Sequence, residues 1–152
     1  MYAHILVPID GSTLSERGLD EACAVAAKLG SAVRLLHVVD DASLVMNAAG
    51  LASNVGELLT SLANAGEQIL DAGRQRAKKH NVFVETVLRH CTAGRVADVI
   101  VQEATQWPAE LIVIGTHGRR GVGRLLLGSD AEQVLRSAPA PVLLVRAGAA
   151  QR

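Results

Sequence analysis

The sequence predicts an α/β domain in which a parallel sheet is covered by helices on both faces. Segments with strand character alternate with segments of helical periodicity along all 152 residues, as in folds built from repeated strand–helix units. Most strand segments are unbroken apolar runs rather than alternating ones, which indicates strands buried on both faces. The length suits one domain, which we expect over 1–147 with a short tail at 148–152.

Apolar runs rich in β-branched residues mark five strands. In chain order they are expected at 5–7, 32–39, 82–88, 111–114 and 142–145. The first ends at Pro8 and the turn-forming Asp10-Gly11-Ser12, and the last follows Pro139 and Pro141.

Helical spacing of small and apolar side chains marks four helices between these strands. They are expected at 14–29, from 55 to near His80, from 96 to just before Trp107, and at 129–137. Thr13 and Glu16 have the spacing of a capping box at the first helix, and Gly30 ends it. Residues 40–54 have small side chains and no clear period, so we expect a mobile connector there.

Charge and aromatic content argue against nucleic-acid binding. The chain has 15 basic and 15 acidic side chains and therefore no net charge, so it lacks the basic field that attracts DNA or RNA. Its aromatic residues, Tyr2, Phe83 and Trp107, are too few and too scattered to form a base-stacking platform.

The cysteines and histidines show no disulfide or metal-ligand pattern. Cys23 falls near the apolar stripe of the first expected helix, where a small buried thiol is the natural interpretation. No apolar run approaches the ~18 residues of a membrane span, and the N-terminus shows no secretory signal. We therefore expect a cytoplasmic protein without membrane contact.

The most informative segment is 115–129, Gly-Thr-His-Gly-Arg-Arg-Gly-Val-Gly-Arg-Leu-Leu-Leu-Gly-Ser. It follows an apolar strand and precedes a helix. Glycines let a backbone approach a ligand closely, and the N–H groups at a helix start attract anions. The spacing differs from both the P-loop and the Gly-x-Gly-x-x-Gly motif. Because so long a loop is uncommon in a compact domain unless it is functional, we expect phosphate binding rather than a flexible surface loop.

The pattern Gly-x2-Gly-x9-Gly-Ser between the fourth strand and the fourth helix resembles the nucleotide-binding signature of the universal stress protein family. The segments 7–12 and 139–145 are similar to that family's first strand and turn and to its last strand. The resemblance covers essentially the whole chain. It implies a Rossmann-like sheet of five parallel strands in the order 3-2-1-4-5, similar to the adenine nucleotide alpha hydrolases, in the ATP-binding branch of the family.

Carried over to this chain, the resemblance implies three groups of contacts with an adenine nucleotide. Near the ribose it places Pro8, Asp10 and Gly115, and at the adenine it places the backbone of Val38. Around the phosphates it places Gly118, Arg119, Gly128, Ser129 and Asp130. The expected cofactor-binding set is completed by a further loop arginine and three residues at the strand ends: Arg124, Ile9, Ile114 and Thr116.

Several of these residues have a second interpretation. Asp10 is either a turn former or a ligand for the ribose or for a nucleotide-bound Mg²⁺. Ser129 and Glu132 have the spacing of a capping box, which is compatible with a phosphate contact. His117 is interpreted as an exposed loop histidine. Asp130 departs from the family, in which this position more often holds an uncharged residue. Its charge favours either a bridging Mg²⁺ or a ligand with fewer charges, such as AMP.

No catalytic constellation is visible, because the sequence has no nucleophile elbow and neither motif of the enzymes that share this topology, His-x-Gly-His or Ser-Gly-Gly-x-Asp-Ser. We therefore expect a stress-response protein that binds ATP or AMP rather than an enzyme. The apolar segment Val142–Val145 at the sheet edge is expected to pair with its copy in a homodimer. The alternatives are a family member with a vestigial pocket that acts through dimerisation, and a slow ATPase.

Overall fold

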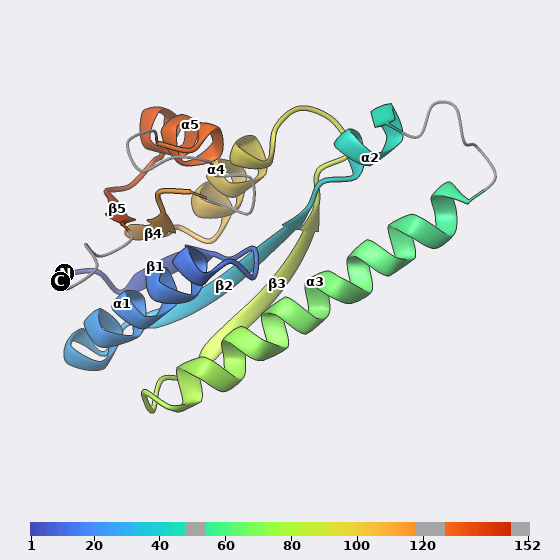
Figure 1. Ribbon diagram of the computed structural model, residues 1–152. Helices are drawn as coiled ribbons and strands as arrows, with labels where there is room; N and C mark the ends of the chain where they lie inside the picture. The colour runs from blue at the N-terminus through green and yellow to red at the C-terminus, as the bar shows by residue number, and fades with distance from the viewer. Residues whose placement is uncertain (48–53, 118–126, 147–152) are drawn as a thin grey trace, which may run out of the picture.

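In the computed structural model of the chain, five parallel strands form one sheet in the order β3-β2-β1-β4-β5 (Figure 1). The structure describes residues 1–47, 54–117 and 127–146. The strands are β1 (His4–Pro8), β2 (Ala32–Val39), β3 (Val84–His90), β4 (Leu111–Gly115) and β5 (Val142–Val145). Strand order and direction confirm the predicted fold class. Because β1 is central, the switch point of the sheet lies at its carboxyl end.

Helices cover both faces of the sheet (Figure 1). The described helices are α1 (Thr13–Leu29), α2 (Asp41–Asn47), α3 (Val55–Lys78), α4 (Val96–Gln106) and α5 (Ser129–Ser137). Val7 and Leu35 pack in the core under α1 and α3, whereas Leu6 and Leu36 pack in the core under α4 and α5. Successive strand residues thus enter opposite cores, which explains the unbroken apolar runs. None of these described helices combines the length and the apolar character needed to span a bilayer.

The prediction of a mobile connector at 40–54 is wrong over its first half, because the helix α2 occupies Asp41–Asn47. The side chain of Asp40 stabilises the start of this helix. Its Oδ1 atom accepts the backbone N–H of Ser43 at 3.0 Å, and its Oδ2 atom accepts the Ser43 hydroxyl at 2.5 Å. A helix of two turns shows little periodicity, so only this cap could have revealed it. Residues 48–53 lie outside the described residues.

The capping box expected at the start of α1 is also wrong. Ser12, not Thr13, is the N-cap, and its Oγ atom accepts the backbone N–H of Ser15 at 3.2 Å. The carboxylate of Glu16 does not return to the helix start and instead pairs with Arg76 of α3 at 3.0 Å. Ser12 and Ser15 therefore cap the N-terminus of α1, and Glu16 contacts α3 instead.

Left-handed residues end two helices. Gly30 ends α1 with φ 70°, as expected. Asn81 follows α3 with φ 57°, and the N–H of Val82 returns to the carbonyl of Ala77 at 3.2 Å. This turn uses the first residues of the expected third strand, so β3 begins at Val84 rather than at Val82.

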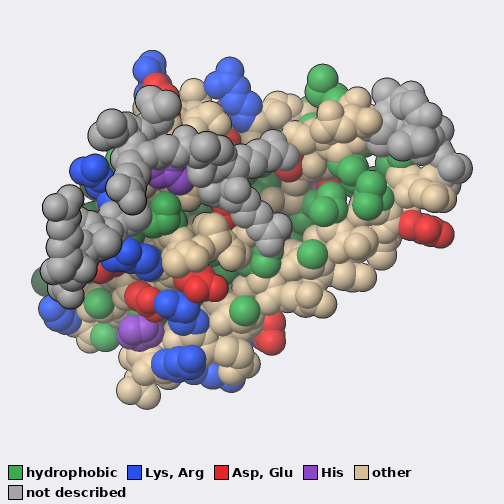
Figure 2. Space-filling view, in the orientation of Figure 1, with side chains coloured by type: hydrophobic (Ala, Val, Ile, Leu, Met, Phe, Trp, Pro, Cys, Tyr) green, Lys and Arg blue, Asp and Glu red, His purple; other side chains and the backbone are tan. Residues whose placement is uncertain are grey.

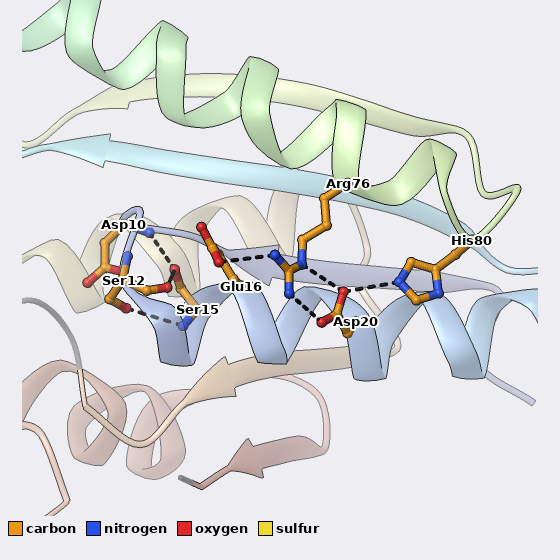
Figure 3. Close-up of polar contacts among 7 residues, drawn as sticks. All are labelled: Asp10, Ser12, Ser15, Glu16, Asp20, Arg76 and His80. Atoms are coloured by element: carbon orange, nitrogen blue, oxygen red, sulfur yellow. Dashed lines mark hydrogen bonds and ion pairs between the residues drawn. The ribbon is translucent and has the colours of Figure 1, made fainter.

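An ion cluster joins α1 to the C-terminal end of α3 (Figure 3). Arg76 donates to both carboxylate oxygens of Asp20 at 2.8 and 2.7 Å, and His80 Nε2 lies 3.0 Å from the same carboxylate. Figure 2 shows acidic, basic and histidine side chains intermingled at this end of the molecule. Hydrogen bonds from Arg76 hold the pKa of Asp20 below its usual value, although partial burial opposes them.

We expect Asp20→Asn to lower the free energy of unfolding at neutral pH by roughly 1 kcal/mol, because both partners are partly exposed. The pKa of Asp20 is lower in the folded chain than in the unfolded chain, where it is ~3.9. The ionised carboxylate therefore stabilises the fold above that value, and the contribution is lost as pH falls through the folded pKa. Denaturant unfolding near pH 7 and near pH 3 measures the effect. A difference of equal size at both pH values would contradict it.

A second ion cluster buries a carboxylate beneath α4. Glu103 is 2% exposed, and its two oxygens accept Arg34 Nη1 and Arg89 Nε, each at 2.8 Å. Arg34 also donates to Glu85 at 2.8 Å and lies over the ring of Trp107, 4.5 Å from its centroid. Charge-assisted hydrogen bonds therefore tie α4 to β2 and β3.

Cys23 is a buried free thiol on the inner face of α1, as expected. The pKa of this thiol is raised to about 11, mainly by burial and secondly by the negative charge of Asp20. At neutral pH the side chain is thus protonated and behaves as a small apolar core residue.

Candidate functional site

The described residues of the expected site converge on the carboxyl ends of three adjacent strands. Pro8 ends β1, Val38 lies one residue before the end of β2, and Gly115 ends β4. Because β1 pairs with both β2 and β4, these ends are neighbours at the switch point, where open α/β sheets bind ligands. The side chains of Ile9 and Ile114 are buried in the two cores, so only their backbones can face a ligand.

The turn after β1 is held by side chains (Figure 3). Asp10 Oδ1 accepts the backbone N–H of Ser12 at 2.9 Å, and the N–H of Asp10 donates to Ser15 Oγ at 3.3 Å. The Ser15 hydroxyl donates in turn to the carbonyl of Ser12 at 2.9 Å. Gly11 permits this tight path with φ 78°. The turn-forming interpretation of Asp10 is therefore confirmed, and its carboxylate is fixed beside the start of α1.

The end of β4 lies directly against the first turn of α1. A Cβ atom on Gly115 would lie 3.2 Å from the backbone and the Cβ of Leu14. A Cβ on Gly18 would lie 3.7 Å from the backbone nitrogen of Gly115. Gly115 therefore lies tightly against the start of α1, and any side chain at this position would require Leu14 to shift.

Thr116 joins the two ends of the glycine-rich segment. Its N–H donates to the carbonyl of Val145 in β5 at 2.9 Å, and its carbonyl accepts the N–H of Gly128 at 2.7 Å. His117 is half-buried, and its Nδ1 lies 3.1 Å from Thr116 Oγ1. The interpretation of His117 as an exposed loop residue is therefore wrong. The remaining loop residues of the expected set, Gly118, Arg119 and Arg124, lie outside the described residues.

The helix α5 begins immediately after this closure. Gly128 is its N-cap with extended backbone, and the Gly128 carbonyl accepts the N–H of Glu132 at 2.9 Å. Ser129 is the first helical residue rather than the cap, and the side chain of Glu132 pairs with Arg136 at 2.8 Å. The expected capping box is therefore wrong. Since the first N–H groups of a helix find no partner inside it, the start of α5 favours an anion at this edge.

Carboxylates gather at the same edge around the buried thiol of Cys91. Burial raises the pKa of this thiol, and four carboxylates raise it further: Asp40, Asp98, Asp130 and Asp41. Asp41 is itself buried, with Oδ2 2.7 Å from His90 Nδ1. Within the described ranges, no three His, Cys, Asp or Glu side chains are arranged to hold a metal ion. At this edge the start of α5 would attract an anionic ligand, whereas these carboxylates would repel it.

His37 is a further polar residue at this edge, outside the set of site residues expected from the sequence. Its Nδ1 atom lies 2.8 Å from the carbonyl oxygen of Ile9, just before the Asp10 turn. The available signal was a single imidazole inside the apolar run of the second strand. The ring also lies close to Gly66 of α3, a contact between distant segments that no local pattern could reveal.

Solved structures share this architecture. The universal stress protein UspA from Lactobacillus plantarum superposes with a TM-score of 0.80 at 26% identity, over 95% of this chain and 98% of its own. A universal stress protein from Archaeoglobus fulgidus described as a complex with dAMP has a TM-score of 0.67 at 23% identity, covering 95% and 97%. An Arabidopsis thaliana family protein described with AMP bound has a TM-score of 0.68 at 18% identity, covering 97% and 93%. At these last two identities the likeness concerns the fold.

Sequence comparison gives the family. Universal stress protein MJ0531 of Methanocaldococcus jannaschii is 34% identical over 147 residues, which cover 96% of this chain and 83% of that protein. The family model described as "Universal stress protein family" matches residues 1–146. The chain therefore belongs to the universal stress protein family.

Proposed function

We propose that this chain binds an adenine nucleotide and acts as a ligand-sensing regulatory protein in the stress response. One observation carries the proposal. Gly115 at the end of β4 lies against Leu14 in the first turn of α1, the helix that follows the Asp10 turn, and the carbonyl of Thr116 accepts the N–H of Gly128 at the start of α5. A ligand held there would touch two strands and two helices, and its binding would stabilise that arrangement. The relatives described as complexes with dAMP and AMP support the class of ligand.

The nucleotide would lie across the carboxyl ends of the strands. In this proposal the backbone of Val38 contacts the adenine, and Pro8, Asp10 and Gly115 lie near the ribose. Gly128, Ser129 and Asp130 at the start of α5 surround the phosphates, together with Gly118, Arg119 and Arg124 of the loop. The fixed geometry of the Asp10 turn supports the ribose position, because a carboxylate already held in place loses little freedom on binding.

Isothermal titration calorimetry with ATP and AMP, with and without magnesium, tests both the function and the ligand. We expect a bridging cation for ATP, because Asp130 stands in the first turn of α5 among other carboxylates. Removing magnesium should then weaken ATP binding about tenfold in the wild type, through like-charge repulsion, and much less in Asp130→Val. Equal ATP and AMP affinity with no magnesium effect would favour a ligand of low charge. Absence of binding by both nucleotides would refute the proposed function.

We also propose that β5 pairs with its copy across a two-fold axis. β5 is an edge of the sheet, and its four residues carry no charge that would discourage pairing. Leu143 is 38% exposed, whereas Leu144 packs on the core under α4 and α5. Leu143→Lys should therefore yield a folded monomer where the wild type is a dimer in light scattering at micromolar concentration. A wild-type monomer, or a dimer unaffected by Leu143→Lys, would contradict this interface.

A further inference from the structure

The hydrogen-bond ladder between β1 and β2 stops at the candidate site. The register pairs Pro8 with Leu36, and one more bond follows, from the Ile9 N–H to the Leu36 carbonyl at 2.8 Å. On the other side of β2, the carbonyl of Val39 accepts the N–H of Cys91 at 2.8 Å. Since the backbone groups of successive strand residues point to opposite sides, the N–H and the carbonyl of Val38 both point towards β1, just beyond the last rung.

The next rung of this ladder would join the Val38 N–H to the carbonyl of Ile9. That carbonyl accepts instead from His37 Nδ1 at 2.8 Å. A carbonyl oxygen is only an acceptor, so Nδ1 carries the proton in this contact. Among the described residues, no hydrogen bond joins the Val38 N–H to Ile9. The imidazole therefore bonds to the carbonyl that the next rung would use, and that rung is not formed.

The position of the His37 ring is fixed by α3. A Cβ atom on Gly66 would lie 2.6 Å from His37 Cδ2 and 2.7 Å from Leu88 Cδ1, so any larger residue would push the ring from its place. Glycine inside a helix costs about 1 kcal/mol relative to alanine, and here the close approach of the imidazole explains its presence. The ring is thus held between the helix and the sheet.

We infer that His37 is the positioning residue for base recognition in the proposed nucleotide site, on whose function this inference rests. By occupying the Ile9 carbonyl, it leaves the Val38 N–H to donate to N1 of adenine while the Val38 carbonyl accepts from the 6-amino group. Hypoxanthine presents the reverse pattern, a donor at N1 and an acceptor at O6. His37 therefore sets the preference for adenine over hypoxanthine without touching the base.

The first test needs no nucleotide. Amide hydrogen exchange of Val38, followed by NMR in the ligand-free protein, should be fast in the wild type. In His37→Leu and His37→Gln the Ile9 carbonyl can accept the Val38 N–H, so exchange should slow at least tenfold, as for one added hydrogen bond of about 1.4 kcal/mol. Asn places its amide nitrogen at the Nδ1 position, so His37→Asn should restore fast exchange, whereas the longer Gln should not. Slow exchange in the wild type, or equal rates in all four proteins, would overturn the inference.

The second test compares AMP with IMP by titration calorimetry in the same proteins. The wild-type preference for AMP should shrink about tenfold in His37→Leu and His37→Gln and return in His37→Asn. A merely structural role would lower the affinity for both ligands and leave their ratio unchanged, which would overturn the inference. If the wild type binds neither ligand, the proposed function fails. The exchange experiment alone then decides whether His37 keeps the Val38 N–H from bonding to the Ile9 carbonyl.

Discussion

Replacing Glu103 with alanine should lower the free energy of unfolding by about 3 to 5 kcal/mol, the range found when one partner of a buried ion pair is removed. Glu103 is 2% exposed and is the shared acceptor of Arg34 and Arg89. Without it two guanidinium groups face each other beneath α4. Arg89 is 47% exposed and can turn towards water, whereas Arg34 is only 19% exposed. We therefore expect the loss to fall at the lower end of the range.

Denaturant unfolding of Glu103→Ala and of two control variants measures this effect. Glu103→Gln keeps the shape but leaves only one oxygen to accept, so it should lose roughly half as much as the alanine variant. Glu132→Ala removes a carboxylate from an exposed pair with Arg136 and should cost less than about 0.5 kcal/mol. Equal losses for Glu103→Ala and Glu132→Ala would show that the buried ion cluster contributes no more to stability than the exposed ion pair does.

The buried glutamate was beyond prediction from sequence, because charged residues in amphipathic helices are nearly always on the exposed face. Glu103 lies within the helical pattern that predicted α4, but its partner Arg34 is 69 positions away on β2. The same is true of His37, whose environment depends on Gly66 of α3. Long-range contacts decide the role of such residues, and a local pattern carries no information about them.

The fold itself was predictable because its signals are local and repeated. An apolar run behind two prolines predicted β5, and helical spacing after Gly128 predicted α5, both with the bounds seen in the structure, 142–145 and 129–137. Strand order is different, since it depends on which strands pair across the sheet. It was expected only from the resemblance carried by the glycine-rich segment, and the structure confirms it.

Helix starts were predicted less well, because several neighbouring residues can cap. Ser12 and Thr13 both qualify before α1, and only backbone geometry selects Ser12. At α5 the acids after Ser129 suggested a capping box, yet Gly128 takes the cap position. Pro8, Val38 and Gly115 lie at adjacent strand ends because the fold brings those ends together, whatever the local caps are.

Gly115→Val should lower the free energy of unfolding by about 3 kcal/mol, the upper part of the usual range for overpacking. A Cβ here would lie 3.2 Å from the carbonyl carbon, the oxygen and the Cβ of Leu14, all at the start of α1. Two of these three atoms are backbone, which cannot swing away as a side chain does. Valine adds two further carbons, so α1 would have to move away from β4.

That movement would also open the candidate site, because the Asp10 turn is bonded to Ser12 and Ser15 at the same end of α1. We therefore expect Gly115→Val to lose adenine-nucleotide binding, and Gly115→Ala to show a smaller loss of both stability and affinity. Gly56→Ala is the matched control, since a Cβ there meets nothing within 4 Å. In a helix that change should stabilise by up to about 1 kcal/mol. If Gly115→Val unfolded like the wild type while binding was lost, the glycine would serve the ligand alone and the packing argument would be wrong.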